Sequence, residues 1–575
     1  MDAPRVIAAL LALGCVSAPS TDDGWASAEL PVRDGAVRPP PLMTLISSAV
    51  VPGGTLRLTA DGATAGDTVW FARGSEIGEG RCPGVLAGLC LDITRGQPLG
   101  AAVADAEGHA ELLVPVPALA RVDLAVAFQA LVFDVPAPYA STTVAMHTTA
   151  PGNVLVIMAD DMGVDKVGRY GLPVDGIPPT PNLDRLMDAG VRFSRAYTSP
   201  SCSPTRAILN TGRQPYQHGV GFALSLDTEI ALSYDETTIP EALDERTGDA
   251  YAHGYIGKWH LGGIRFDYLD NPNLHGWDTF AGLLVGMKAE HATDGLAMTY
   301  NNWERVVNGV PGRSATYMTT HMVDDAIALM DDLPEPWVVV LATFAPHAPY
   351  HWPPEDLWSG ELLGPEEHDQ QYNAAVEAMD TELGRLLDTM SPELAANTTI
   401  VFLGDNGTPV DGVDDPFYAE RSKETVYEGG VHVPLIVSGP LVDTPGSECD
   451  ALVHAADVLP TVLDIAGAPY GDEELEALYG RSLVPWIRDP ELGGGREMVY
   501  AEMFKGPGPA PHTAYLRMVR DDRWKVHQNL AGPDQFFDLE GVLLEGEDLL
   551  ADGVLSPDEQ AAYDRLIAAM PTPLE

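Results

Sequence analysis

The sequence is poor in basic residues. Its 575 residues include 33 Lys and Arg but 84 Asp and Glu, which gives a formal net charge of −51 at pH 7. Because proteins bind nucleic-acid phosphates through Lys and Arg, this balance argues strongly against a nucleic-acid-binding role. The same charge repels anionic lipid headgroups and polyanionic substrates at long range. A protein of this composition that handles an anion must therefore build a locally basic pocket against its own field.

The sequence also lacks a hydrophobic run long enough to span a bilayer. The N-terminal apolar run from Val6 to Leu13 is too short for a membrane helix and is typical of a secretory signal peptide. We predict that residues 1–19 direct export and that the protein is periplasmic or on a bacterial cell surface. Around Cys15 two interpretations stay open. The segment LALGC resembles a scrambled lipoprotein cleavage box, which would add a lipid anchor, and it equally fits an ordinary cleaved signal peptide.

Cysteine is scarce, with five residues in the whole chain. Cys82 and Cys90 are close in sequence, and export permits a disulfide between them, although two small buried residues would give the same pattern. Cys202 and Cys449 have no obvious partner. An unpaired cysteine in an exported chain is a residue whose chemistry needs an explanation.

What remains is an ordinary globular composition, with 45% hydrophobic and 20% charged residues, and a length that suits two to four domain-sized units. Residues 20–41 are rich in Pro, Asp and Ser and are predicted to be a linker. Between residues 42 and 148, short alternating apolar runs separated by Gly- and Pro-containing turns predict a β-sandwich of roughly seven strands. This segment has no cluster of acids, histidines or nucleophiles. A spacer role is therefore favoured, with carbohydrate or cell-surface binding as the alternative.

From residue 150 to 449 the pattern changes to buried strands alternating with helices. Continuous apolar runs at 153–159, 337–344, 398–404 and 433–439 are typical of strands buried on both faces of a parallel sheet. Helical spacing lies between them, for instance over 182–193, where Gly190 is the predicted stop. The alternation predicts an α/β domain with a mostly parallel, doubly wound sheet. Residues 450–575 are predicted to form a small C-terminal α+β subdomain, with one more helix, a strand pair and a final helix.

Polar side chains follow the predicted strands at their carboxyl ends, where open parallel sheets bind ligands. They are Asp160 and Asp161, Lys258 and His260, His347, and Asp405 and Asn406. Three carboxylates and one amide offer only oxygen ligands, which suit Ca²⁺ or Mg²⁺ and do not suit a thiolate or imidazole zinc site. An anionic substrate beside such an ion would need nearby cations. The candidates are Lys258, His260, His347, Arg206 and Lys423.

Cys202 is predicted to lie at the N-terminus of a helix, because Ser201 or Ser203 can cap it and Pro204 fits its first turn. This setting favours an anion through the backbone N–H groups and the helix dipole. Three interpretations stay open from the residues alone: a buried structural thiol, an anion site, or the low-pKa nucleophile of a cysteine hydrolase.

The segment CSPTR, residues 202–206, matches the Cys-x-Pro-x-Arg motif of the type I sulfatases, which belong to the alkaline phosphatase superfamily. Leu209 and the Thr211–Arg213 segment continue the match, whereas Asn210 stands where the family usually has an apolar residue. GYIGKWHLGG (254–263) resembles the second family motif. Four further blocks occur in family order: NVLVIMADDMG, APHAPY, LGDNG and KETVYEGGVHVP, where His432 replaces a common Arg. The chain from about 150 to 545 therefore resembles this family.

The resemblance implies an alkaline phosphatase-like α/β fold and a specific chemistry. Cys202 would be oxidised to formylglycine by a formylglycine-generating enzyme, and the aldehyde hydrate would attack the sulfur of a sulfate ester. Asp160, Asp161, Asp405 and Asn406 would hold one Ca²⁺ ion. Arg206 and His260 would orient the modified residue. Lys258, His347 and Lys423 would bind the sulfate, with His347 as the best candidate to protonate the leaving oxygen. The substrate would be a sulfated small molecule or glycan.

Two alternatives stay open. A formylglycine-dependent phosphonate or phosphodiester hydrolase resembles this chain at the nucleophile, but those enzymes tend to have Asp-His where this chain has Asp405-Asn406. Asn406 therefore favours Ca²⁺ and a singly charged sulfate ester. A non-catalytic surface glycan-binding protein with a sulfatase fold is the other alternative. It is disfavoured because degenerate enzymes usually lose a metal ligand or the nucleophile, and here the set is complete.

Overall fold

The buried apolar runs of the sequence become the central strands of one large sheet. The structure is a computed structural model, and it describes residues 43–47, 51, 54–77, 91–94, 96–116, 125–133, 135, 138–147, 152–172, 176–227, 230–288, 291–413, 419–493, 495–505, 512, 514–529, 531–551 and 553–571. The predicted signal peptide (1–19) with Cys15, the linker (20–41), and both Cys82 and Cys90 lie outside the described residues. The chain divides into two compact units, one within residues 1–148 and one that contains residues 149–575.

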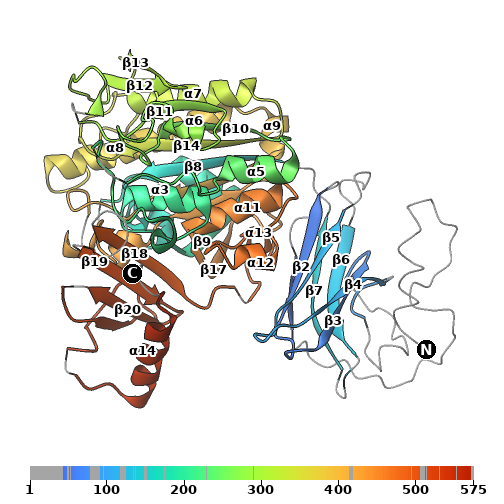
Figure 1. Cartoon of the computed structure of the whole chain (residues 1–575). Coiled ribbons are helices and arrows are strands. Elements are labelled where there is room, and N and C mark those ends of the chain that lie inside the picture. The colour runs from blue at the N-terminus through green and yellow to red at the C-terminus, as the bar shows by residue number, and fades with distance from the viewer. Residues whose placement is uncertain are drawn as a thin grey trace. The chain divides into compact units, whose positions relative to one another are not determined.

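The large sheet of the second unit has ten strands, and its centre is parallel (Figure 1). Five neighbouring strands run in the same direction: β11 (Thr279–Leu283), β10 (Ala252–Lys258), β14 (Trp337–Pro346), β8 (Asn153–Asp160) and β15 (Thr398–Gly404). The outer strands are β12 (Trp303–Val307) and β13 (Val310–Ser314) on one side, and β16 (Leu435–Ser438), β9 (Gly190–Tyr197) and β17 (Ser447–His454) on the other. The predicted mostly parallel sheet is confirmed.

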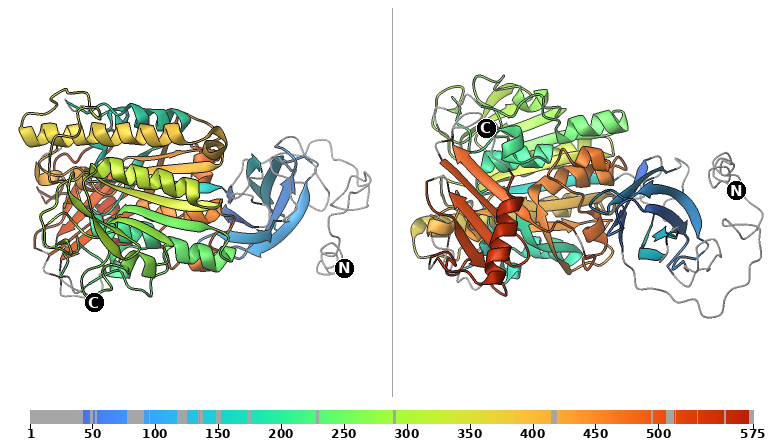
Figure 2. Two further views of the ribbon diagram at one scale, coloured as in Figure 1. Left: turned by 90° about the horizontal axis from the view of Figure 1, so that it is seen from above. Right: turned by 60° about the horizontal axis from the view of Figure 1, so that its bottom comes forward.

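Alternate residues of each central strand face opposite helix layers. In β8, Val154 and Val156 belong to one apolar cluster, whereas Leu155 and Ile157 belong to the other. The first cluster includes residues of α3 (Cys202–Thr211), α5 (Ile239–Thr247), α11 (Val458–Ile465) and α13 (Val484–Arg488). The second includes residues of α2 (Pro181–Ala189), α7 (Met318–Asp332) and α8 (Glu367–Thr389). Helices therefore cover both faces, as Figures 1 and 2 show, and the doubly wound arrangement is confirmed.

Short helices complete this unit at the strand ends and in the connections. They are η2 (Val164–Lys166), η3 (Gly168–Tyr170), α4 (Pro215–His218), α6 (Asn271–Leu274), α9 (Pro392–Ala396), η5 (Ala419–Arg421), α10 (Glu428–Val431), η6 (Ala455–Asp457) and α12 (Asp472–Leu475). Within the part of the chain that the structure describes, no helix is long and apolar enough to cross a membrane.

Strand direction is the feature that the apolar pattern does not encode. The predicted run at 433–439 contains β16, but β16 is antiparallel to both β15 and β9. The predicted helix over 182–193 ends at Ala189, and Gly190 then begins β9. Gly190 is required there because a Cβ atom would lie 2.3 Å from the Val437 carbonyl oxygen. The predicted stop is thus confirmed, and the residues after it belong to a strand.

The C-terminal region forms a separate antiparallel sheet of four strands: β18 (Val499–Lys505), β19 (Ala514–Arg520), β20 (Trp524–Asn529) and β21 (Gln535–Asp538). Helix α14 (Pro557–Ala569) lies along this sheet (Figure 2). The predicted boundary between residues 449 and 450 falls inside β17, which belongs to the large sheet. The strand pair expected from the sequence is one half of a sheet that begins at Val499.

The first unit contains seven described strands in two antiparallel sheets. One sheet has the order β1-β2-β5 and the other β4-β3-β6-β7. The strands are β1 (Thr44–Ser47), β2 (Thr55–Asp61), β3 (Thr68–Gly74), β4 (Gln97–Val103), β5 (Ala110–Pro115), β6 (Ala125–Val132) and β7 (Tyr139–His147). In β2 every second residue is buried, as an amphipathic strand requires. The two sheets agree with the sandwich that the sequence predicts.

A buried ion cluster joins the C-terminal sheet to helix α10 of the same unit. The Lys525 Nζ atom on β20 lies 2.7 Å from Glu428 Oε1 of α10 and 2.7 Å from Glu545 Oε1. All three side chains are buried. Although burial alone favours the neutral form of Glu428, the Lys525 and Arg520 charges hold the pKa of this carboxyl below its usual value. The Lys525 charge therefore compensates the two buried carboxylates, and removing it would leave both of them without this partner.

We predict that Lys525→Met destabilises the protein by about 3–5 kcal/mol, because it leaves two buried carboxylates without their shared partner. Urea unfolding followed by circular dichroism measures the change. Asp188→Asn is the matched control, since it breaks the largely exposed Arg169–Asp188 pair and should cost at most about 1 kcal/mol. Equal stabilities of the two variants would contradict the prediction.

Candidate active site

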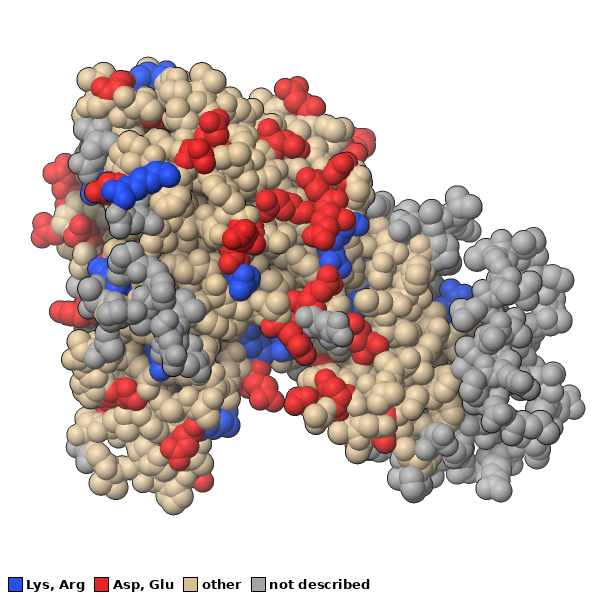
Figure 3. Space-filling model, viewed as in Figure 1, with Lys and Arg blue, Asp and Glu red and all other residues tan. Residues whose placement is uncertain are grey.

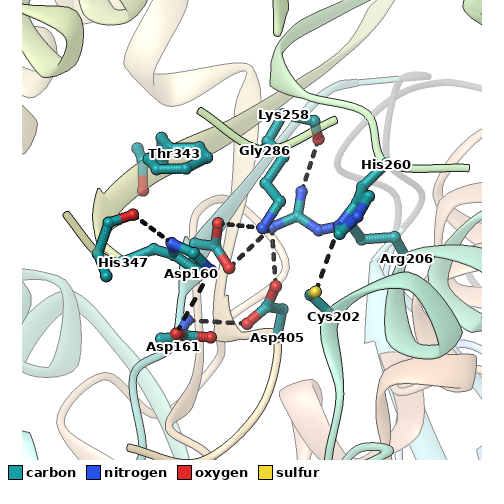
Figure 4. Close-up of polar contacts among 12 residues, drawn as sticks. Asp160, Asp161, Cys202, Arg206, Lys258, His260, Gly286, Thr343, His347 and Asp405 are labelled. Atoms are coloured by element: carbon teal, nitrogen blue, oxygen red, sulfur yellow. Dashed lines mark hydrogen bonds and ion pairs between the residues drawn. The ribbon is translucent and has the colours of Figure 1, made fainter. Parts of the chain in front are cut away.

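The polar residues predicted to gather at one sheet edge do lie together. Asp160 is the last residue of β8 and Lys258 is the last residue of β10. His347 directly follows β14, and Asp405 with Asn406 directly follows β15. Figure 4 shows the side chains of Asp160, Asp405 and Lys258 turned toward one another. Parallel strands end at the same edge, so the sheet itself brings these groups together.

Helix α3 supplies the next two residues. Cys202 is its first residue, and Arg206 lies one turn further along the same side of the helix. The Arg206 guanidinium is fully buried, with Nη1 2.6 Å from the Lys258 carbonyl oxygen and Nη2 2.8 Å from Asp405 Oδ2. Burial alone would lower its pKa, but Asp405 and Asp160 raise it, so the guanidinium stays charged. One side chain therefore ties α3 to the ends of β10 and β15.

His260 is oriented so that one ring nitrogen faces Cys202. Its Nδ1 atom lies 3.3 Å from Cys202 Sγ, and its Nε2 atom lies 2.7 Å from the carbonyl oxygen of Leu224. A carbonyl can only accept, so Nε2 carries the hydrogen and the neutral ring presents the Nδ1 lone pair to residue 202. Burial, with the nearby Lys258 charge, holds the pKa of His260 well below its usual value. His260 is therefore a base aimed at the side chain of residue 202.

The Cys202 thiol is itself a poor nucleophile in this setting. Its side chain is buried, and burial raises the pKa of the thiol above its usual value despite the positive charges of Lys258 and Lys423. The thiolate is the reactive form of cysteine, so a protonated thiol disfavours the cysteine hydrolase interpretation.

Three carboxylates and three cations balance one another in the site. Lys258 Nζ lies 2.6 Å from Asp160 Oδ2, Lys423 Nζ pairs with Asp161 Oδ1, and Arg206 pairs with Asp405. Burial would raise the pKa of Asp161, but the Lys423 and Lys258 charges hold it below the usual range. On the face seen in Figure 3, by contrast, acidic side chains are widespread and basic ones are few. The site thus gathers cations, which are few on that face.

The oxygen donors of the site fit a hard divalent cation. Asn406 Nδ2 donates to Asp161 Oδ1 at 2.9 Å and to the Gly407 carbonyl at 3.0 Å, so its Oδ1 atom is left for another partner. Among the described residues, Asn406 Oδ1 and Asp160 Oδ1 are both buried without a hydrogen-bond partner. Such atoms are costly unless something binds them. Asp160, Asp161 and His347 also offer ligand atoms within 4.8 Å of one another.

Asp405 is engaged differently from the other acidic residues. Its Oδ1 atom accepts the backbone N–H of Asp161 at 2.9 Å, and its Oδ2 atom accepts Arg206. Burial, reinforced by Asp160, raises the pKa of Asp405 to about 6. Each carboxylate oxygen has a second lone pair, so these bonds leave Asp405 able to act as a ligand.

His347 presents its second ring nitrogen to the site. Nδ1 lies 2.6 Å from the Ala348 carbonyl oxygen and therefore carries a hydrogen, whereas Nε2 lies 3.7 Å from Asp161 Oδ2. Burial lowers the pKa of His347 to about 3, so the ring is neutral before an anion binds. A negatively charged group next to Nε2 would favour its protonated form.

Several residues that hold the site residues in place could not be identified from the sequence pattern. The Tyr372 hydroxyl on α8 donates to the Asp161 carbonyl at 2.6 Å, and the Tyr255 hydroxyl donates to the Lys258 carbonyl at 2.8 Å. Leu224, which fixes the His260 ring, acts only through its backbone. Tyr372 lies in a segment whose helical spacing predicts only a helix. Its contact joins residues 211 positions apart, which no local pattern reports.

Comparison with known proteins places the chain in a family. A family model described as "Sulfatase" matches residues 152–468, and a model described as "N-sulphoglucosamine sulphohydrolase, C-terminal" matches residues 418–550. The first match covers more than half of the chain. The chain therefore belongs to the sulfatase family, whose members hydrolyse sulfate esters, and it has the alkaline phosphatase-like fold expected of that family.

Individual relatives agree with this assignment. "Uncharacterized sulfatase YdeN" of Escherichia coli is 30% identical over 399 residues, which are 60% of this chain and 68% of the relative. Mouse "Arylsulfatase J" is 28% identical over 417 residues, covering 66% of this chain and 64% of the relative. The solved structure of Ps i-CgsB in complex with k-i-k-neocarrahexaose is 27% identical, with a TM-score of 0.60, and the match covers 72% of this chain and 92% of that chain.

Asn406 provides a test of the proposed cation ligands. Asn406→Ala should weaken Ca²⁺ binding without unfolding the protein, because it removes a neutral ligand and keeps the carboxylates. Asn406→Asp should bind Ca²⁺ at least as tightly, yet lower kcat/KM for a sulfate ester, because a fourth carboxylate repels the anion by about a few kcal/mol. Each ~1.4 kcal/mol corresponds to roughly tenfold in rate.

Isothermal titration with Ca²⁺ and steady-state kinetics on both variants measure these effects in parallel. Unchanged Ca²⁺ affinity in Asn406→Ala would contradict the ligand assignment, and wild-type sulfatase activity in Asn406→Asp would contradict the charge argument.

Proposed function

We propose that this sulfatase uses a formylglycine at position 202 as its nucleophile. The CSPTR segment provides the sequence in which sulfatases carry this modification. The observation that carries the proposal is the His260 Nδ1 lone pair, which lies 3.3 Å from the side chain of residue 202. A cysteine hydrolase would need a Cys202 thiolate paired with a His260 imidazolium, but burial raises the pKa of the thiol and lowers the pKa of the imidazole, which disfavours both charged forms. A hydrated aldehyde instead offers His260 a hydroxyl proton to remove as sulfate leaves. The partner required during maturation is a formylglycine-generating enzyme.

The residues of the site then divide the steps between them. Lys258, Lys423 and His347 bind the sulfate, and the bound anion favours uptake of a proton from solvent at His347 Nε2. One hydroxyl of the hydrate, whose own proton passes to solvent, attacks sulfur. The S–O bond to the leaving group breaks, its electron pair stays on the leaving oxygen, and His347 Nε2 supplies the proton that makes a neutral alcohol. His260 Nδ1 then takes the proton of the second hydroxyl, sulfate leaves, and the aldehyde is restored. Throughout these steps Arg206 holds the start of α3 against the ends of β10 and β15.

The proposed cofactor is a single Ca²⁺ ion held by Asp160, Asp161, Asp405 and Asn406. The two buried oxygens without hydrogen-bond partners, on Asp160 and Asn406, support this ligand set. When bound, the ion supplies Lewis acidity at a sulfate oxygen and favours the ionised hydroxyl of the hydrate. Asn406 also supports a sulfate ester over a phosphonate or phosphodiester, because the formylglycine-dependent hydrolases of those substrates tend to have His at this position.

We propose a sulfated glycan as the substrate class. The 27%-identical Ps i-CgsB was solved in complex with k-i-k-neocarrahexaose. In this chain, Trp352 is 37% exposed and stacks on Trp358, with ring centroids 5.2 Å apart. Trp352 is only five residues after His347, so its Cα lies within about 18 Å of the His347 Cα. Exposed aromatic faces in ligand grooves commonly bind apolar faces of ligands such as sugar rings.

We also propose that the protein acts outside the cytoplasm, in the periplasm or at the cell surface, as its predicted signal peptide implies. An extracellular location suits environmental sulfated glycans. A lipid anchor at Cys15 would make release from membranes depend on detergent, and Cys15→Ser would abolish that dependence.

Mass spectrometry of the tryptic peptide that contains residue 202 tests the nucleophile. Active protein should carry the aldehyde in place of the thiol, and Cys202→Ser should lose nearly all activity where only a cysteine-specific converting enzyme is present. Cys449→Ala is the matched control, because Cys449 is also buried and free but lies on β17. Full activity with an unmodified thiol at position 202 would overturn the proposal.

Replacing Trp352 tests the substrate class. Trp352→Ala should raise KM for a sulfated oligosaccharide by roughly tenfold, which corresponds to about 1.4 kcal/mol of lost contact between the indole and an apolar sugar face. It should leave 4-nitrophenyl sulfate hydrolysis unchanged, because that substrate has no sugar ring. Trp352→Phe keeps an aromatic face and should recover most of the oligosaccharide affinity. An equal effect on both substrates would argue against a sugar platform.

A further inference from the structure

A buried tyrosine, Tyr300, contacts the segment that carries His347 and comes from the chain just before β12. The Tyr300 hydroxyl lies 2.7 Å from the His347 carbonyl oxygen and 3.1 Å from the Phe344 carbonyl oxygen. Tyr300 is 2% exposed and lies just before β12, and its own carbonyl accepts the Met318 N–H at the start of α7. The hydroxyl donor therefore comes from outside the His347 segment, from a residue that is itself bonded to the start of α7.

A stack of rings fixes the other end of the same segment. The His351 ring lies 3.9 Å from the Tyr300 ring, centroid to centroid, and nearly parallel to it at 26°. Tyr317 contacts both rings, with centroids 5.7 Å from Tyr300 and 5.5 Å from His351, and its hydroxyl lies 3.0 Å from His351 Nε2. The segment from His347 to His351 is thus held at its first residue by a hydrogen bond and at its last residue by stacking.

These contacts leave His347 little freedom. Its backbone N–H donates to the Phe344 carbonyl at 3.0 Å, and its ring Nδ1 donates to the neighbouring Ala348 carbonyl. The direction of Nε2 therefore depends on where the Ala348 carbonyl lies, and that carbonyl follows from the orientation of the preceding 347–348 peptide. The Tyr300 hydroxyl is the group that fixes the His347 carbonyl of that peptide from outside the segment. Without it, the peptide could rotate and carry Nε2 away from the leaving oxygen.

We propose that Tyr300 is a positioning residue for proton transfer from His347 to the leaving group. The inference rests on the proposed function, in which the His347 Nε2 proton moves to the leaving oxygen as the S–O bond breaks. Tyr300 touches neither the substrate nor the reacting atoms. It acts by keeping His347 Nε2 directed at the leaving oxygen. Small displacements of a catalytic group lower the reaction rate strongly.

Leaving-group dependence separates this role from a merely structural one. The variant is Tyr300→Phe, which keeps the stacked ring and removes only the hydroxyl. An alkyl or sugar sulfate leaves as a poor alkoxide and needs the proton, so its kcat should fall about tenfold or more. 4-Nitrophenyl sulfate has a good leaving group that needs no proton, so its kcat should change less than about twofold.

Tyr170→Phe is the matched control. Tyr170 is also buried in the same apolar cluster, and its hydroxyl bonds the Leu435 backbone instead. It should lower stability without changing the ratio of the two kcat values. Tyr317→Phe is a second variant, to be used if Tyr300→Phe folds poorly. It loosens the same segment through His351 and should shift the ratio of the two kcat values in the same direction.

His347→Gln tests the proton-donor role of His347 separately from the positioning role of Tyr300. If His347→Gln impairs the poor leaving group selectively but both tyrosine variants affect the two substrates equally, the positioning role is overturned and the proposed function stands. If His347→Gln itself affects both substrates equally, His347 is not the proton donor, and the role proposed for Tyr300 falls with it. Selective loss in all three variants supports the inference.

Discussion

The arrangement of this site depends on one buried guanidinium. Arg206 donates to the Lys258 carbonyl and to the Asp405 carboxylate, and Asp160 lies 3.6 Å away. It thereby joins the helix that begins with Cys202 to the ends of three strands of the central sheet, β10, β8 and β15. A buried charge is tolerated only when it is paired and hydrogen-bonded, so these partners and their spacing are mutually required. Lys cannot replace this fork, because it lacks the two separate donors that reach β10 and β15 together.

The same pairing explains how a strongly acidic protein can bind an anion. The chain has a net charge of −51, yet Arg206, Lys258 and Lys423 match the three carboxylates of the site one for one. A divalent cation on the neutral Asn406 and its acidic neighbours would make the site positive overall. The anion is then attracted by a local charge that the low dielectric of a buried site strengthens, whereas the distant surface charges are screened by salt.

The sequence predicted the parts of the fold and of the site that local patterns encode. Continuous apolar runs indicated the central strands, and the polar residues just beyond them, such as Asp160 and Asp405, share an edge because parallel strands end together. The antiparallel direction of β16 and the membership of β17 in the large sheet were not predictable, since apolar burial looks the same in either direction. The roles of Tyr372 and Tyr300 depend on long-range contacts for which a single sequence holds no signal.

The central claim is that an aldehyde at position 202, served by the His260 base, carries out the reaction. The most direct measurement is titration of the active enzyme with an aldehyde-reactive hydroxylamine, with activity and labelling of residue 202 followed together. The account predicts that activity falls in proportion to the fraction of residue 202 that is labelled, and that sulfate, which occupies the site, slows both equally. Full activity after complete labelling, or an active enzyme with no reactive aldehyde, would contradict it.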